Sequence, residues 1–118
     1  MKDLQLFMKE FQLKHNWQIK NGDYNKSKES LLMNQMLLTT EVAEIAEEFR
    51  KLFKLSENSP EDSRQEAFEH TKSLITEDLG KEIADCLAYL IKFANYFNID
   101  IEESFYNKMD EIDKRMEK

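Results

Sequence analysis

Two short stretches of the chain place acidic residues three positions apart. The first is Glu41-Val-Ala-Glu44-Ile-Ala, and the second is Glu82-Ile-Ala-Asp85-Cys-Leu. Because each helical residue turns the chain by about 100°, this spacing leaves both carboxylates of a pair on one helix face. In each segment the acids lie along one edge of an apolar stripe. If the two stripes pack together, the four carboxylates converge at the border of the core.

Four converging carboxylates repel one another, and partial burial increases that cost. A cation among them removes the repulsion, and ligands that offer only oxygen select hard ions, Mg²⁺ first and Mn²⁺ next. Magnesium also keeps coordination positions that substrate phosphates can fill. The spacing alone leaves a second interpretation open, a solvated acidic face, because acid pairs three apart recur in this chain. These other pairs are Glu44/Glu47, Glu66/Glu69, Asp100/Glu103 and Asp110/Asp113.

The elements that carry these acids are predicted to be long helices. The chain has only 2 Gly and 1 Pro, and no segment alternates with a period of two. Apolar spacing predicts helices over residues 2 to about 17, about 27 to 55, 77 to 97 and about 101 to 116. Ser27 or Ser30 is expected to cap the second helix, and Asp100 the last. The fold class is therefore all-α, with four main helices in a bundle-like arrangement.

The segments between these helices contain the turn and loop signals. Asn21-Gly22-Asp23 predicts a turn, and residues 56–62 predict a loop in which Pro60 suits a helix start. Residues 61–76 are polar, and we expect a short helix or a mobile connection there. The expected core stripes are Leu38, Val42, Ile45, Phe49 and Leu52 in one helix, and Leu79, Ile83, Cys86, Leu90 and Phe93 in the other.

The composition predicts one acidic domain over residues 1–118, too short for two domains. A net charge of −7 disfavours binding to nucleic-acid polymers and to anionic membranes. No apolar run approaches the roughly 20 residues of a membrane span, and the N-terminus lacks a signal-peptide pattern. The single Cys86 fits a reducing compartment, so we expect a cytoplasmic protein.

The run Leu37-Leu-Thr-Thr-Glu41-Val-Ala-Glu44-Ile-Ala-Glu47-Glu48-Phe49, followed by Lys81-Glu82-Ile-Ala-Asp85-Cys-Leu-Ala-Tyr-Leu, resembles the MazG family of nucleotide pyrophosphohydrolases. That family, of the all-alpha NTP pyrophosphatase type, shares E-x-x-E on one helix and E-x-x-D on the next. The resemblance covers residues 30 to 97 well and the ends loosely. It implies an all-helical homodimer or homotetramer and magnesium-dependent hydrolysis of a (deoxy)nucleoside triphosphate to the monophosphate and pyrophosphate.

The resemblance also implies roles for individual residues. Glu41, Glu44, Glu82 and Asp85 become the metal ligands, with Glu41 and Glu44 counted among the catalytic residues. Glu48 lies one turn beyond Glu44, so it could orient the attacking water or bind metal.

Four further residues are candidates for contacting the substrate. Lys81, Lys108 and Arg115 could contact the outer phosphates, although each has the alternative of being a solvated cation. Trp17 could stack on a base, with a place in the core or in a subunit interface as its alternative.

Two positions depart from the family pattern. Thr40 stands where a second acid often precedes the first motif, and Ile112 replaces an Asn between Lys108 and Arg115. A catalytically inactive nucleotide-binding relative therefore stays open, as does an acidic helical module that binds a basic partner. A di-iron carboxylate enzyme is disfavoured, because neither histidine follows a glutamate by three residues.

Overall fold

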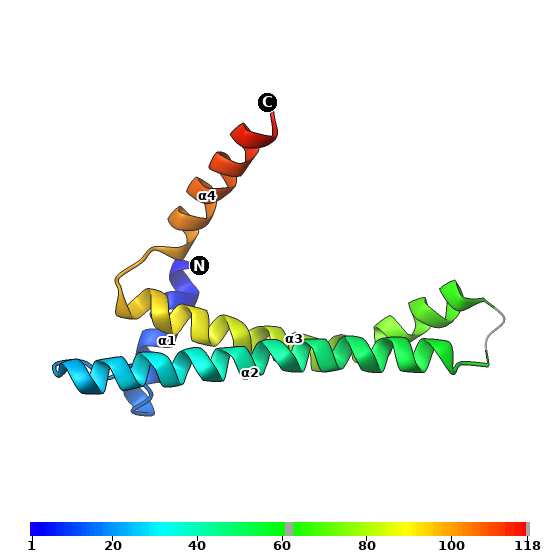
Figure 1. Cartoon of the computed structure of the whole chain (residues 1–118), viewed down its shortest axis with the longest axis horizontal. Helices are drawn as coiled ribbons and strands as arrows, with labels where there is room; N and C mark the ends of the chain where they lie inside the picture. Colours follow the sequence, from blue (N-terminus) through cyan, green and yellow to red (C-terminus); the bar gives the residue numbers. More distant parts are fainter. Residues whose placement is uncertain (61–62, 118) are drawn as a thin grey trace. The chain divides into compact units, whose positions relative to one another are not determined.

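The computed structural model describes residues 1–60 and 63–117, and these form four α-helices (Figure 1). They are α1 (Lys2–Lys14), α2 (Tyr24–Glu57), α3 (Arg64–Tyr96) and α4 (Ile101–Met116). No strand occurs among the described residues, so the all-α prediction with four main helices is confirmed. Within the same residues, no helix combines the length and the apolar character that crossing a membrane requires.

The chain divides into two compact units, each of which contains part of α2 and part of α3. The first unit, Met1–Asn34 with Ala88–Lys118, contains α1, the start of α2, the end of α3 and α4. The second unit, Gln35–Leu87, pairs the rest of α2 with α3 up to Leu87 as antiparallel neighbours (Figure 1). Both acidic motifs lie in the second unit.

The second unit is built on a seam of residues spaced three and four apart, which is typical of helices that pack along their lengths. In α2 the buried and half-buried residues include Leu38, Glu41, Ile45, Glu48, Leu52 and Ser56. In α3 they include Thr71, Ile75, Leu79, Glu82 and Cys86. Near the end of the hairpin the Phe53 and Phe68 rings lie 6.0 Å apart. Three carboxylates therefore occupy core-type positions.

This seam corrects the predicted core stripes. Val42 and Phe49 were expected in the core, yet they are 52% and 45% exposed, and Ile83 is 51% exposed. Leu38, Ile45 and Leu52 belong both to the predicted stripe and to the observed seam. The stripe and the seam differ only in which neighbouring side of the helix they include. Apolar character favoured the side with Val42 and Phe49, whereas α3 packs against the side with Glu41 and Glu48.

Helix α2 begins earlier than expected. The turn at residues 21–23 is confirmed, with Gly22 at φ +93°, and the helix starts directly after it at Tyr24. Asp23 accepts a hydrogen bond from the Asn25 backbone N–H at 3.2 Å. Ser30, an expected cap, instead lies inside the helix, and its hydroxyl accepts a hydrogen bond from the Lys20 backbone N–H at 3.0 Å. Capping by Ser27 or Ser30 was thus wrong.

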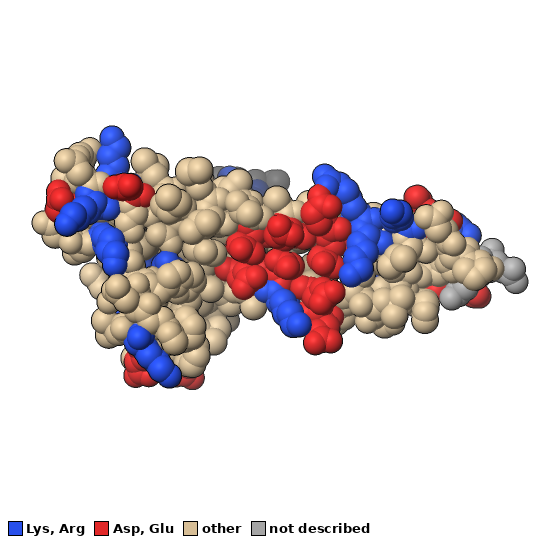
Figure 2. Space-filling model, turned by 90° about the horizontal axis from the view of Figure 1, so that it is seen from below, with Lys and Arg blue, Asp and Glu red and all other residues tan. Residues whose placement is uncertain are grey.

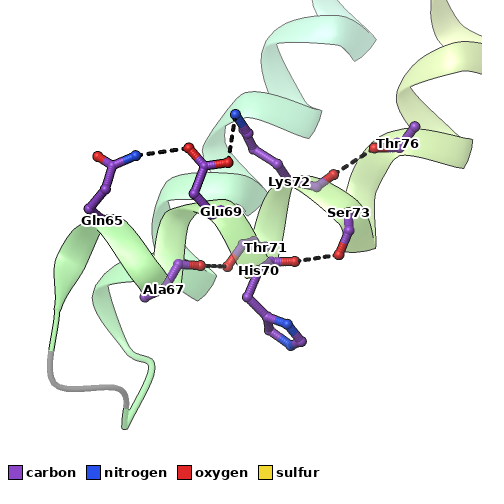
Figure 3. Close-up of polar contacts among 8 residues, drawn as sticks. All are labelled: Gln65, Ala67, Glu69, His70, Thr71, Lys72, Ser73 and Thr76. Carbon is purple, nitrogen blue, oxygen red and sulfur yellow. Dashed lines mark hydrogen bonds and ion pairs between the residues drawn. The ribbon is translucent and has the colours of Figure 1, made fainter.

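The polar segment before the second motif is fully helical from Arg64 onward (Figure 3). Thr71 and Thr76 donate their hydroxyls to carbonyls one turn earlier, each at 2.7 Å, and Glu69 accepts from Gln65 and pairs with Lys72. These local bonds let polar residues remain in the helix. The expected short helix or mobile connection was wrong for residues 64–76. Residues 61 and 62 lie outside the described residues.

The boundaries of the other segments follow from the same helices. Ser56, expected in a loop, lies in α2 and donates to the Leu52 carbonyl at 2.7 Å. Pro60 lies before α3 without starting it. Gly80 lies inside α3, where a Cβ would meet nothing within 4 Å.

In the first unit, α1 packs against the segment that links α3 to α4. The Gln5 amide donates to the Ile99 carbonyl at 2.8 Å and accepts from the Ile101 N–H at 3.1 Å. Asp100 caps α4 as predicted, accepting from the Glu103 N–H at 3.1 Å. Helix α1 ends at Lys14 rather than near residue 17, because Asn16 adopts φ +51°.

Candidate functional site

Three of the four predicted ligands come together between α2 and α3. One carboxylate oxygen from each of Glu41, Glu82 and Asp85 lies within 4.8 Å of the other two. Glu41 and Glu82 are half-buried in the seam, and Asp85 is exposed beside them. The E-x-x-D spacing places Asp85 one turn after Glu82, so α3 supplies two carboxylates to the one from α2.

The electrostatics of this trio favour a bound proton or a bound cation. Burial raises the pKa of Glu41 above its usual 4.5, and Asp85, Glu82 and Glu44 raise it further. Burial also raises the pKa of Glu82, with Asp85, Glu44 and Glu48 adding to the effect, while a hydrogen bond with Glu41 lowers it. Since like charges and desolvation both oppose ionisation, neutralising the trio stabilises this part of the seam.

Glu44 and Glu48 surround the trio without joining it. Glu44 is exposed, and its charge reaches both Glu41 and Glu82. The Glu48 side chain is only 15% exposed, and its Oε2 atom is buried without a hydrogen bond. Lys51 Nζ lies 4.0 Å from that oxygen, too far for a hydrogen bond, and 3.5 Å from Asp78 Oδ2. Glu48 therefore retains an unused acceptor.

The surface view shows the carboxylates of this region gathered into one continuous acidic patch, with lysine and arginine side chains at its border (Figure 2). Lys51, which the sequence analysis did not single out, links α2 to α3 through Asp78. Lys81 is 69% exposed and pairs with Glu77 at 3.7 Å along α3. The patch thus combines the half-buried Glu41 and Glu82 with exposed carboxylates around them.

The donor set fits a hard divalent cation. Every side-chain donor in the trio is a carboxylate oxygen, and the unused Glu48 oxygen is of the same kind. Such donors suit Mg²⁺ or Mn²⁺ and do not select soft ions. Cys86 is buried, and burial together with Glu41, Asp85 and Glu82 raises the pKa of its thiol. A neutral thiol is a poor metal ligand and a poor nucleophile.

The remaining predicted site residues lie in the first unit. Lys108 pairs with Glu111 on exposed α4 at 3.3 Å, and Arg115 is exposed near the end of that helix. Trp17 is half-buried, and its ring already has partners: the Lys92 ammonium lies 3.8 Å from the ring centroid and the Tyr89 ring 5.5 Å away. These contacts agree with the structural alternative for Trp17.

Lys92 was missed by the sequence analysis. It is 2% exposed, and its ammonium donates to Asn34 Oδ1 at 2.6 Å. The available signal was a lysine in an apolar run, Tyr89-Leu-Ile-Lys-Phe-Ala, on a helix whose neighbouring residues are mostly large and apolar.

No protein-family model, curated protein or solved structure matches this chain. The likeness to the MazG family rests on the two short motifs and their apolar framing.

Proposed function

We propose that the protein is a magnesium-dependent nucleoside triphosphate pyrophosphohydrolase, which converts a (deoxy)nucleoside triphosphate to the monophosphate and pyrophosphate. The observation that carries the proposal is the approach of Glu41, Glu82 and Asp85 oxygens to within 4.8 Å of one another. Two of these acids occupy core-type seam positions, where an apolar side chain would pack at lower cost. A cation-binding role explains why acids occupy these seam positions.

In this proposal Glu41, Glu82 and Asp85 hold the metal, and Glu44 adds negative charge or a further ligand. Magnesium, when bound, neutralises charge on the phosphates and makes water a better nucleophile. The carboxylates on α2 and α3 fix the position of the reacting triphosphate relative to the seam. Because the ligands come from long helices rather than loops, their spacing is held by backbone hydrogen bonds.

Glu48 is the residue that we assign to the attacking water. Its buried Oε2 lacks a hydrogen-bond donor and lies on the same α2 seam, two turns after Glu41. A carboxylate in that state can accept a hydrogen bond from water and then take its proton. Lys51, at 4.0 Å, restrains Glu48 without satisfying this oxygen. Lys81, which directly precedes Glu82 on α3, remains a proposed phosphate contact.

A homodimer or homotetramer forms part of the proposal. The second unit exposes large apolar side chains on the side of α2 that borders the seam. Val42, Phe49 and Phe53 are each 45% to 52% exposed. Exposed large apolar groups at helical spacing are typical of surfaces that a partner covers, and a second copy of the chain is the simplest partner.

The direct test is pyrophosphate release from a panel of canonical and modified nucleoside triphosphates, with and without Mg²⁺. Wild type should release pyrophosphate only with the metal, and Glu41→Gln should reduce the rate by at least about 100-fold. Glu47→Gln is the matched control, because Glu47 is exposed on the same helix and pairs with Arg50. Absence of release from every nucleotide, with intact helical content, would overturn the proposal.

A second candidate is an acidic interaction module that binds a basic partner. Exposed acids beside the seam, Glu44 and Asp85 among them, favour it, as does the acidic patch on the surface (Figure 2). The two candidates differ in their response to ligands. An enzyme of the proposed class is stabilised thermally by Mg²⁺ together with a non-hydrolysable nucleotide, whereas an interaction module is not.

A further inference from the structure

Helix α4 carries a narrow apolar stripe whose residues remain accessible to solvent. The members of the stripe recur at intervals of three and four: Ile101, Phe105, Met109, Ile112 and Met116. At about 100° per residue, they lie within an arc of about 80° around the helix axis. None of residues 101–116, all of which the structure describes, is buried, and Phe105 and Met116 are 54% and 80% exposed. The stripe is therefore available to a partner.

A helix of this length needs a packed apolar side to be stable. Helix α4 has 16 residues and no alanine, and isolated helices of about 12–15 residues are marginal in water even when they are rich in alanine. The contacts of α4 with α1 hold its first turn, where the Ile101 N–H donates to Gln5 Oε1 at 3.1 Å. The amino group of Met1 also lies 3.4 Å from Glu102 Oε1. A partner on the stripe would stabilise the turns that follow.

The charged residues that border the stripe differ in sign between its two sides. Asp113 borders one side, and Lys108 and Arg115 border the other. Each lies about 60–80° from the centre of the stripe, by the rotation of about 100° per residue. In two parallel helices packed stripe against stripe, each acidic border meets the basic border of the other copy. An antiparallel pair would bring the two basic borders together, so the charges favour the parallel arrangement.

The stripe also fits the heptad of a parallel helix pair. Apolar residues occupy its a and d positions: Phe105, Met109, Ile112 and Met116. In this frame Lys108 is a g residue and Asp113 is the following e residue, and parallel in-register helices form ion pairs between such positions. Lys108 pairs with exposed Glu111 of its own helix at 3.3 Å, a surface contact that it can exchange at little cost. Glu102, the a residue of the first turn, is already paired with the amino group of Met1.

We propose that α4 is an interaction surface for a second copy of this chain, with the two α4 helices parallel and in register. The two stripes form the centre of the contact, and Lys108 of each copy pairs with Asp113 of the other. The same residues then serve both copies, as in other two-fold symmetric interfaces. This contact is separate from the α2 surface with Val42 and Phe49, because no residue of the second unit takes part. It also does not depend on the enzymatic activity.

Disulfide formation in a glutathione redox buffer tests the orientation of the pair in the full chain. Parallel helices place each d residue opposite its own copy, so Phe105→Cys and Ile112→Cys should each form a homodisulfide. Asp110→Cys, on the opposite side of α4, is the matched control, and its effective thiol concentration should be at least about tenfold lower. Wild type gives the background of Cys86, which is buried.

Reversal of the two charges tests the ion pairs with the same readout. In chains that carry Ile112→Cys, Lys108→Glu or Asp113→Lys should each lower the effective thiol concentration by about tenfold, because like charges then meet. Both changes together should restore it, because the two pairs form again with opposite sense. Residues five apart do not face each other within one helix, so an effect confined to a single α4 would show no such rescue.

Three outcomes would overturn the proposal. The first is a disulfide yield from Phe105→Cys and Ile112→Cys no higher than that from Asp110→Cys. The second is a mixture of the two reporter chains that forms only the mixed disulfide, identified by mass spectrometry, because this indicates an antiparallel pair. The third is failure of the double charge reversal to restore the yield. Circular dichroism checks that each variant is folded, and the two reporters test the contact independently.

Discussion

Glu41 on α2 and Glu82 on α3 face each other across the helix seam, with carboxylate oxygens within 4.8 Å, at positions where packed helices ordinarily place apolar side chains. Burial raises the pKa of both, and the charge of Glu82 adds to the rise at Glu41, whereas a hydrogen bond with Glu41 lowers the pKa of Glu82. The pair therefore weakens the hairpin unless a proton or a cation lies between the two helices. This relationship leads to three of the predictions below.

Divalent metal should stabilise the protein through these residues. Because a ligand that binds only the folded state adds RT ln(1 + [L]/Kd), Mg²⁺ at about 100 times its Kd adds about 2.7 kcal/mol. Calorimetry should show this as a higher Tm for wild type. Glu82→Gln should lose most of the metal-dependent shift, while Glu77→Gln, at an exposed position on α3, should retain it. An equal shift in both variants would exclude the trio as the metal site.

Removing one charge should raise the stability of the metal-free protein. Glu41→Gln keeps the size of the side chain and relieves repulsion with Glu82 and Asp85, so we expect Tm in chelator to rise by roughly 3 °C. The same variant should lose pyrophosphate release. Stability and activity would thus change in opposite directions, as is common at sites that hold like charges together. A lower Tm in chelator would contradict the repulsion.

The stability of the metal-free protein should fall as the pH rises above 4.5. Glu41 and Glu82 have raised pKa values in the folded state, so the fold binds more protons than the unfolded chain above the ordinary value of 4.5. Stability is then highest when both are protonated and is lost as the pH passes through the raised values. Denaturant unfolding of wild type and Glu41→Gln from pH 4.5 to 7 measures the difference, and saturating Mg²⁺ should remove it.

Lys92 should give the opposite dependence at alkaline pH. Burial and the charge of Lys20 lower the pKa of Lys92 to about 8, from 10.5. Between these values the unfolded chain binds the extra proton, so the contribution of Lys92 to stability increases from pH 8 to 10.5. The full change is about 3 kcal/mol. From pH 8 to 10.5 the free energy of unfolding of wild type should rise by this amount relative to that of Lys92→Met, as measured by urea unfolding at both pH values. Parallel curves for the two proteins would show an unperturbed lysine.

The exposed apolar side of α2 should mediate self-association. Phe49→Asp places a charge among Val42 and Phe53, so a homodimer that covers this side should dissociate or weaken by at least about 100-fold. Light scattering coupled to size-exclusion chromatography measures the mass. Glu57→Lys, an exposed charge change near the end of α2, controls for net charge. A monomeric wild type, or an oligomer unaffected by Phe49→Asp, would exclude this surface.

The sequence predicted the helix content, and also which acids share a helix face, because both depend on local spacing. The acids three apart had to share a helix face, and Asp100 could cap α4 from its position alone. The side of α2 that packs was not predictable, because Leu38, Ile45 and Leu52 belong to both possible stripes. In the folded protein α3 packs against the side of α2 that carries Glu41 and Glu48, not the side that carries Val42 and Phe49. Local propensity also misjudged residues 64–76, since threonine side chains there bond to the helix backbone.

The buried ammonium of Lys92 could not be predicted from residue spacing. Asn34 and Lys92 are 58 residues apart, and their contact depends on how α2 and α3 meet within the first unit. A lysine in an apolar run is compatible with an exposed head group on a buried stem, and only the packed structure removes that option.

Gly80 lies in the interior of α3, two residues before Glu82, with open space where a Cβ would be. A glycine in a helix interior costs about 1 kcal/mol relative to alanine, and the loss is local. Amide hydrogens next to Gly80 should therefore exchange with solvent faster than those elsewhere in the same helix. We therefore expect the backbone that carries Glu82 and Asp85 to yield more easily than the neighbouring turns of α3, so that the carboxylates can adjust to the radius of a cation that binds there.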